Sequence, residues 1–112
     1  MHFLALLSSL FTITLAHPQP ERIAAISHQV FGSRWSAAAC IAHYESTDGA
    51  HLVNGVNRGP WQVSISAHLW VNAQRLVTDW TYSARVTYRI SNGGRDGSAW
   101  RTTSRLCGLT RH

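Results

Sequence analysis

The feature that most limits what this chain can fold into is an uncharged apolar run near its N-terminus. The run extends from Phe3 to Ala16 and is followed by the polar, proline-containing sequence HPQPER. It is shorter than the roughly 20 apolar residues that a transmembrane helix needs. Small residues at Thr14 and Ala16 are typical of the end of a secretory signal peptide. We therefore predict a signal peptide over residues 1–16, a secreted protein, and one domain over residues 17–112. A retained N-terminal anchor is the alternative.

A domain of this size has a small core, so a covalent cross-link would help to stabilise it. The chain has two cysteines, Cys40 and Cys107, and an even number in an exported protein favours a disulfide bond. The bond would contribute roughly 2–4 kcal/mol and would tie the C-terminal segment to the segment that contains Glu45. Two buried free thiols are the alternative.

The positive charge of the chain is carried by arginine alone. There are ten basic residues, all arginine, against five acidic ones, which gives a formal net charge of +5. Such a protein is attracted to polyanions, including nucleic acids, anionic membranes and bacterial cell wall. The arginines are dispersed and form no basic block or nucleic-acid-binding motif. Charge alone therefore does not choose a partner. Our expectation is no nucleic-acid partner, no stable membrane insertion and a monomer.

Proline, glycine and capping residues predict a mostly helical domain. A first helix should begin at Pro20 and end at Gly32, and a second should span residues 33–46 with Ser33 as its N-cap. Residues 47–60 are rich in Gly, Asn and Asp, which predicts a long loop that could contain a short hairpin.

The C-terminal half is expected to add further helices. Residues 63–76 should become helical after the Trp-Gln pair, and another helix should begin at Asp79 and end at the Asn92-Gly93-Gly94 sequence. The segment 95–108 should form turns and one helical turn. The expected architecture is a mostly α domain of the α+β class, with about four to five helices.

One glutamate lies at an unexpected position in the second predicted helix. At helical spacing Ala38, Ile41, Ala42 and Glu45 share one face, and the first three belong in a core. A carboxylic acid is rarely buried without a reason. In an apolar pocket a carboxyl group keeps its proton to a higher pH and can give it to the oxygen of a leaving sugar. The alternative is that Glu45 faces solvent or pairs with an arginine.

The small number of acidic residues bears on the reaction. Hydrolysis of a glycosidic bond by paired carboxyl groups needs two of them, roughly 5–9.5 Å apart. Asp48 is close to Glu45 in the sequence, whereas Asp79 is expected to cap a helix. If Glu45 serves alone as acid and base, an internal sugar nucleophile is favoured over water, and the product is an anhydro sugar.

Three sequence segments suggest a family. They are IAHYES (residues 41–46), RGPWQVS (residues 58–64) and LVTDWTYSARVTYRISNGG (residues 76–94), followed by Trp100. In this order they resemble the soluble lytic transglycosylase type of the lysozyme-like superfamily, in which a Glu-Ser pair ends a helix and a Gly-x-x-Gln segment follows. The resemblance covers nearly all of residues 17–112 and implies a small lysozyme-like domain that cleaves peptidoglycan glycan strands.

The resemblance also implies residue roles. Glu45 would be the catalytic acid and base, Ser46 would orient it or a nearby carbonyl, and Gln62 would contact the substrate N-acetyl group. Tyr88 would hold the acid in position. Each of the last three has a structural alternative: Ser46 as a helix cap, Gln62 bonded to backbone in a short strand, and Tyr88 as part of the core.

Five tryptophans are many for so short a chain, and sugar rings stack on aromatic faces. Trp61, at the edge of the long loop, and Trp100, after the Gly-Gly turn, are the candidates for binding substrate. We expect Trp35 and Trp70 to be ordinary core residues. Trp80 stands where the family commonly has proline.

Other features separate this chain from the family or exclude other chemistry. Pro60 and Ser83, like Trp80, depart from the family pattern. The histidines are scattered without the spacing of a zinc site, so we expect no metal and no cofactor. No Ser or Cys forms a nucleophile motif.

The sequence therefore predicts a secreted lytic transglycosylase that acts on the β-1,4 bond between N-acetylmuramic acid and N-acetylglucosamine. One alternative is a lysozyme-type hydrolase that cuts the same bond, with Asp48 or a held water completing the reaction. Another is a non-catalytic cell-wall-binding or cationic antimicrobial protein.

Overall fold

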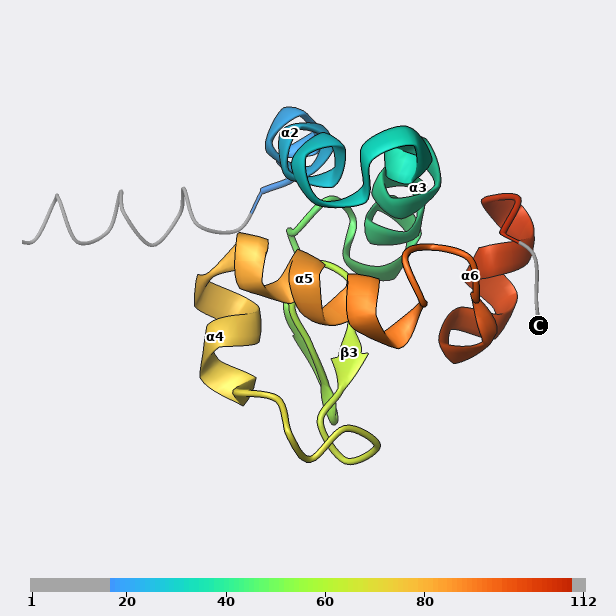
Figure 1. Cartoon of the computed structure of the whole chain (residues 1–112). Coiled ribbons are helices and arrows are strands. Elements are labelled where there is room, and N and C mark those ends of the chain that lie inside the picture. The colour runs from blue at the N-terminus through green and yellow to red at the C-terminus, as the bar shows by residue number, and fades with distance from the viewer. Residues whose placement is uncertain (1–16, 110–112) are drawn as a thin grey trace, which may run out of the picture.

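A computed structural model of the protein describes residues 17–109. The predicted signal peptide, residues 1–16, lies outside the described residues. Figure 1 shows helices α2 and α3 side by side, with α5 packed beneath α2, a small sheet on the far side of α5, and α6 next to the lower end of α3. The predicted class, a mostly helical α+β domain with a hairpin after the helix that carries Glu45, is confirmed.

Helix α2 extends from Pro20 to Phe31, as the proline at its start and Gly32 after its end predict. Proline fixes a backbone angle suited to the first helical turn. At the other end Gly32 takes a positive φ of 57° and its N–H donates to the carbonyl of His28. The face that contains Ile23 is buried against α3 and α5.

Helix α3 extends from Trp35 to Ser46, and the prediction that Ser33 caps it is wrong. Ser33 lies within a 3₁₀ turn, Gly32–Arg34, that leads from α2 directly into α3. The chain thus enters α3 from an already helical turn. No extended residue precedes α3 to act as a side-chain cap.

The end of α3 is a sharp reversal of the chain. Thr47, Asp48 and Gly49 all have positive φ, at 54°, 55° and 89°. Ser46 Oγ donates to the carbonyl of Ala42 at 3.0 Å and accepts from the N–H of Gly49 at 2.9 Å. Gly49 lies against the indole of Trp80, where a β-carbon would clash. This turn places Glu45 in the last turn of α3.

The long loop contains the expected hairpin. Strands β1 (Val53–Asn54) and β2 (Asn57–Arg58) pair antiparallel, with Val53 opposite Arg58. Strand β3 (Val63–Ser64) adds to β2 in the order β1-β2-β3.

The helix expected over residues 63–76 is mostly wrong. β3 and turns occupy its first part, and α4 spans only Ala73–Thr78. Two features oppose a helix here. Gln62 has a φ of 52°, and the Val-Ser-Ile-Ser sequence that follows it alternates with the period of a strand. Asn72 caps α4 by accepting from the N–H of Arg75.

Helix α5 spans Trp80–Ile90 and matches its predicted bounds. Asp79 Oδ1 accepts from the N–H of Tyr82 at 3.0 Å, so its expected role as N-cap is confirmed. Beyond the helix Asn92 and Gly93 take positive φ and turn the chain.

The C-terminal segment forms a 3₁₀ turn, Ser98–Trp100, and helix α6, Arg101–Leu106. The predicted disulfide between Cys40 and Cys107 is present, with its Cα atoms 5.6 Å apart. Within residues 17–109 no helix is long and apolar enough to cross a membrane.

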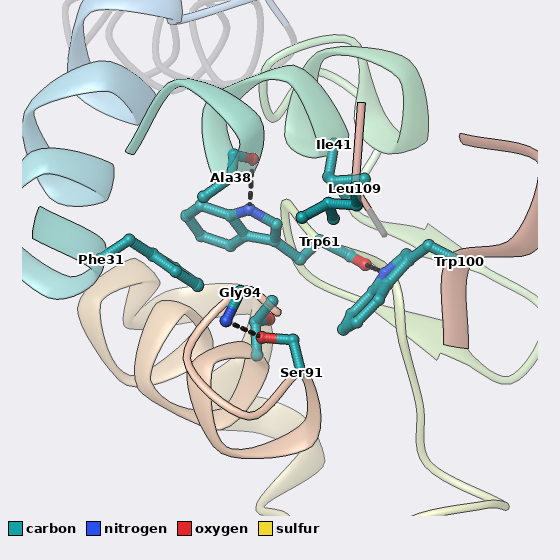
Figure 2. Close-up of a pocket in the computed structure, with 9 residues that line it drawn as sticks. Phe31, Ala38, Ile41, Trp61, Ser91, Gly94, Trp100 and Leu109 are labelled. Atoms are coloured by element: carbon teal, nitrogen blue, oxygen red, sulfur yellow. Dashed lines mark hydrogen bonds between the residues drawn. The ribbon is translucent and has the colours of Figure 1, made fainter. Parts of the chain in front are cut away.

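Two tryptophans connect the helices to the sheet. Trp61 is fully buried, and its Nε1 donates to the Ala38 carbonyl of α3 at 2.9 Å. Trp100 Nε1 donates to the carbonyl of Trp61 at 2.7 Å. Figure 2 shows Trp61 between α3 and Trp100, with Phe31 and Leu109 closing the same apolar pocket. These two bonds connect α3, the turn before β3 and the C-terminal segment.

Candidate functional site

Glu45 lines a small hollow with a volume of about 120 Å³. Its lining divides into two walls. We call the residues from helices and the C-terminal segment the helical wall: Glu45, Ile90, Ala99 and Trp100. We call the residues from the hairpin and the loop after it the strand wall: Asn57, Gln62, Val63, Ser64 and His68.

Glu45 is partly buried in this hollow and is held by one hydrogen bond. Thr103 Oγ1 donates to Glu45 Oε2 at 2.6 Å. Among residues 17–109 no arginine forms an ion pair with Glu45, and Oε1 accepts no hydrogen bond. The carboxyl group therefore has one fixed oxygen and one that is available to a ligand. Of the residues that line the hollow, Glu45 alone carries a carboxyl group.

The structure brings Gln62 into the same hollow as Glu45, although its amide is already engaged. Gln62 Nε2 lies 3.0 Å from the carbonyl of Gly59 and 3.2 Å from that of Leu52. Gln62 Oε1 accepts from Asn54 Nδ2 at 2.8 Å. The side chain therefore cross-links the hairpin, which is the structural alternative considered for it, and it also lines the hollow.

Two expectations about tryptophan are wrong. Trp61 is fully buried, so no face of its indole is free to stack on a sugar. Trp70, expected in the core, is 47% exposed and lies under the guanidinium of Arg89, with 4.3 Å between them. Trp100 does line the hollow, although only 5% of it is exposed.

Tyr88 does not reach Glu45. Its ring packs on Phe31 with centroids 5.5 Å apart, and 45% of the residue is exposed. It lines a separate depression together with Arg34 and Asn92. The bond to Glu45 that the resemblance assigns to this tyrosine is made instead by Thr103.

Ser46 and Asp48 also lie outside the hollow. Both hydrogen bonds of Ser46 go to backbone at the end of α3, as expected for a helix cap. Asp48 Oδ2 lies 3.2 Å from Nδ1 of His43, and the residue is 9% exposed. Asp48 is therefore not placed as a second carboxyl group facing a substrate in this hollow.

The residues that depart from the family pattern lie in the core beside the hollow. Pro60 and Ser83 are buried, and Trp80 packs on Gly49. A β-carbon on Gly59 would lie 2.7 Å from Ser83 Oγ, and it would also clash with the carbonyl of Leu76. Glycine is therefore required at position 59 of the Gly-x-x-Gln segment for two reasons: a side chain would clash there, and the φ of 85° favours glycine.

His68 was missed as a site residue because only its place in the fold shows its role. Its Nδ1 lies 3.0 Å from the carbonyl oxygen of Ser64. A carbonyl can only accept, so Nδ1 is the donor in this hydrogen bond. Thr103 was missed for the same reason, since it is far from Glu45 in the sequence. The spacing of the chain gave no signal for either residue.

The exposed surface of the domain is rich in arginine. Every arginine of residues 17–109 except Arg58 is exposed. Asp79, one of the few acids, has its pKa lowered by the hydrogen bond from the Tyr82 N–H and by Arg75, whose Nη2 lies 3.1 Å from Asp79 Oδ2. No three His, Cys, Asp or Glu side chains of the described chain come together as a metal site requires.

The arrangement can position a proton donor against one polar ligand. The hollow is lined by Glu45 and by four polar side chains from the strand wall, Asn57, Gln62, Ser64 and His68. No protein-family model, curated protein or solved structure matches this chain.

Proposed function

We propose that this chain is a secreted enzyme that cleaves peptidoglycan glycan strands, with Glu45 as its general acid and base. The observation that carries the proposal is the single carboxyl group of the hollow, which has one oxygen fixed by Thr103 and one unoccupied. A general acid needs this combination of fixed geometry and a free proton-bearing oxygen. The polar side chains of the strand wall, Asn57, Ser64 and His68, would supply hydrogen-bonding groups to a sugar.

The proposed reaction is a lytic transglycosylation. Glu45 gives its proton to the oxygen that leaves with N-acetylglucosamine as the bond from C1 of N-acetylmuramic acid breaks. The resulting carboxylate accepts the proton of the muramic 6-hydroxyl while O6 bonds to C1. The products are a new N-acetylglucosamine end and a 1,6-anhydromuramic end. No second carboxyl group is needed, which agrees with the position of Asp48 outside the hollow.

The cationic surface supports the choice of substrate. Exposed arginines surround a domain of formal net charge +5, and bacterial cell walls carry negative charge. Such a surface raises the concentration of the enzyme at the bacterial cell wall, and this electrostatic attraction weakens as the salt concentration increases.

Hydrolysis of the same bond is the second candidate, and His68 is the observation that favours it. His68 lines the same hollow as Glu45, and its Nδ1 is engaged by the carbonyl of Ser64, which leaves Nε2 as the nitrogen that would act as a base. A base in the same hollow as the acid would activate a water molecule, which would replace O6 as nucleophile. The product would then be a reducing muramic end.

Digestion of purified peptidoglycan followed by mass spectrometry tests the proposal and separates the two reactions. Transglycosylation gives muramic ends that are lighter by one water than the reducing ends that hydrolysis gives. We expect anhydro ends. Reducing ends would establish the hydrolase instead. Wall binding without any cleavage would leave a binding or antimicrobial protein as the function.

A further inference from the structure

Helices α3 and α6 are linked at two points with matching spacing. The first link is the Cys40–Cys107 disulfide, and the second is the hydrogen bond from Thr103 to Glu45. Glu45 follows Cys40 by little more than one turn of α3, and Thr103 precedes Cys107 by about one turn. Because the order of the two pairs is opposite, the segments run antiparallel. One link therefore sets the register of the other.

The hydroxyl group of Thr103 is engaged by Glu45. The residue is 9% exposed, and its side chain makes a single hydrogen bond among the described residues, the one to Glu45 Oε2 at 2.6 Å. Helix α6 has only six residues, too few to be stable alone. Its place depends on the disulfide at its end and on Trp100 before its start, whose indole is bonded to Trp61.

We propose that Thr103 is the positioning residue of Glu45, and that the Cys40–Cys107 disulfide sets the helix register in which their hydrogen bond forms. The inference rests on the proposed function of Glu45 as general acid. Fixing Oε2 leaves Oε1 directed at the substrate, and misplacement of a reacting group by about 1 Å can cost about a hundredfold in rate. Reduction of the disulfide would release α6 and with it the acid, so cleavage would require oxidising surroundings.

Variants of Thr103 test the first half of the inference. Thr103→Val keeps the shape of the side chain and removes the hydroxyl, and we expect kcat to fall about tenfold to a hundredfold with KM almost unchanged. Thr103→Ser restores the hydroxyl and should recover most of kcat. Thr102→Val, a change at the exposed neighbouring residue, is the matched control. Full kcat in Thr103→Val, or no recovery in Thr103→Ser, would overturn the positioning role.

Reduction of the disulfide tests the second half. The reduced wild type, still helical by circular dichroism, should lose kcat to about the level of oxidised Thr103→Val. Reduction of Thr103→Val should add little further loss, because two changes that act through one contact are not additive. Additive losses, or loss of the helical signal on reduction, would overturn this half, since the bridge would then act on folding as a whole.

Glu45→Gln separates the inference from the function on which it rests. If the wild type does not cleave peptidoglycan, or if Glu45→Gln cleaves it normally, the proposed function fails and takes the inference with it. If the wild type cleaves, Glu45→Gln does not, and Thr103→Val keeps its full kcat, the inference alone fails.

Discussion

The two walls of the hollow are built and anchored in different ways. The helical wall has one polar side chain, Glu45, among apolar ones, and a disulfide and a buried indole hold its segments together. The strand wall has four polar side chains and rests on strands of two residues each. The difference suggests that the two walls have different roles. The proposed acid, Glu45, lies on the wall whose segments are joined by the disulfide, and most of the polar side chains lie on the wall built from short strands.

Trp61 belongs to neither wall and supports both, so its loss should have the largest effect on stability. Trp61→Ala removes a fully buried indole and its hydrogen bond to Ala38, and core changes of this kind cost about 3–5 kcal/mol. Urea denaturation followed by circular dichroism measures the loss. Trp61→Phe should cost clearly less. Equal stability of the wild type and Trp61→Ala would show that the walls do not share this support.

Gln62 should matter for the strand wall alone. Gln62→Asn tolerates the positive φ at this position but is too short to reach both Gly59 and Leu52, and an unsatisfied buried carbonyl costs about 1–3 kcal/mol. Amide hydrogen exchange should accelerate in residues 52–64 while α3 keeps its protection. The control is Gln74→Asn on the exposed face of α4. Equal acceleration in α3 would mean that the walls are one cooperative unit.

Asp79 lies outside both walls and should have the smallest effect. Its pKa is lowered in the folded protein by the Tyr82 N–H and Arg75, so the charged carboxylate favours folding above the ordinary pKa of aspartate. That contribution is lost as the pH falls through the lowered pKa. Asp79→Asn keeps a capping oxygen without the charge. Thermal unfolding of the two proteins should therefore differ at about pH 6 and converge at about pH 2. A difference that persists in acid would contradict this assignment.

Local signals in the sequence predicted much of the fold. Pro20 and Gly32 delimit α2, and Asp79 and the Asn92-Gly93 turn delimit α5, because caps and positive φ are properties of a few neighbouring residues. The disulfide followed from the number of cysteines. Ser33 does not cap α3 as predicted, because the chain passes from α2 through a 3₁₀ turn directly into α3. The helix predicted over residues 63–76 is mostly absent, because its first residues form strand β3.

Much less of the site could be predicted. Glu45 and Gln62, which were singled out from two short motifs, line the same hollow, and their roles stay predictions. The burial of Trp61 and the position of Tyr88 depend on packing between distant segments. No local sequence pattern distinguishes a buried indole from an exposed one. Thr103 and Glu45 lie far apart in the sequence and meet only where α6 packs on α3.

The rate of fragment release from purified peptidoglycan shows whether Glu45 is the proton donor of a glycan-cleaving site. We expect Glu45→Gln to lower this rate by about a hundredfold or more without changing stability, whereas Glu21→Gln, a change at an exposed acid on α2, should leave it unaltered. Equal release by the wild type and Glu45→Gln would show that Glu45 is not the proton donor, and a wild type that releases nothing would show that the chain does not cleave glycan strands.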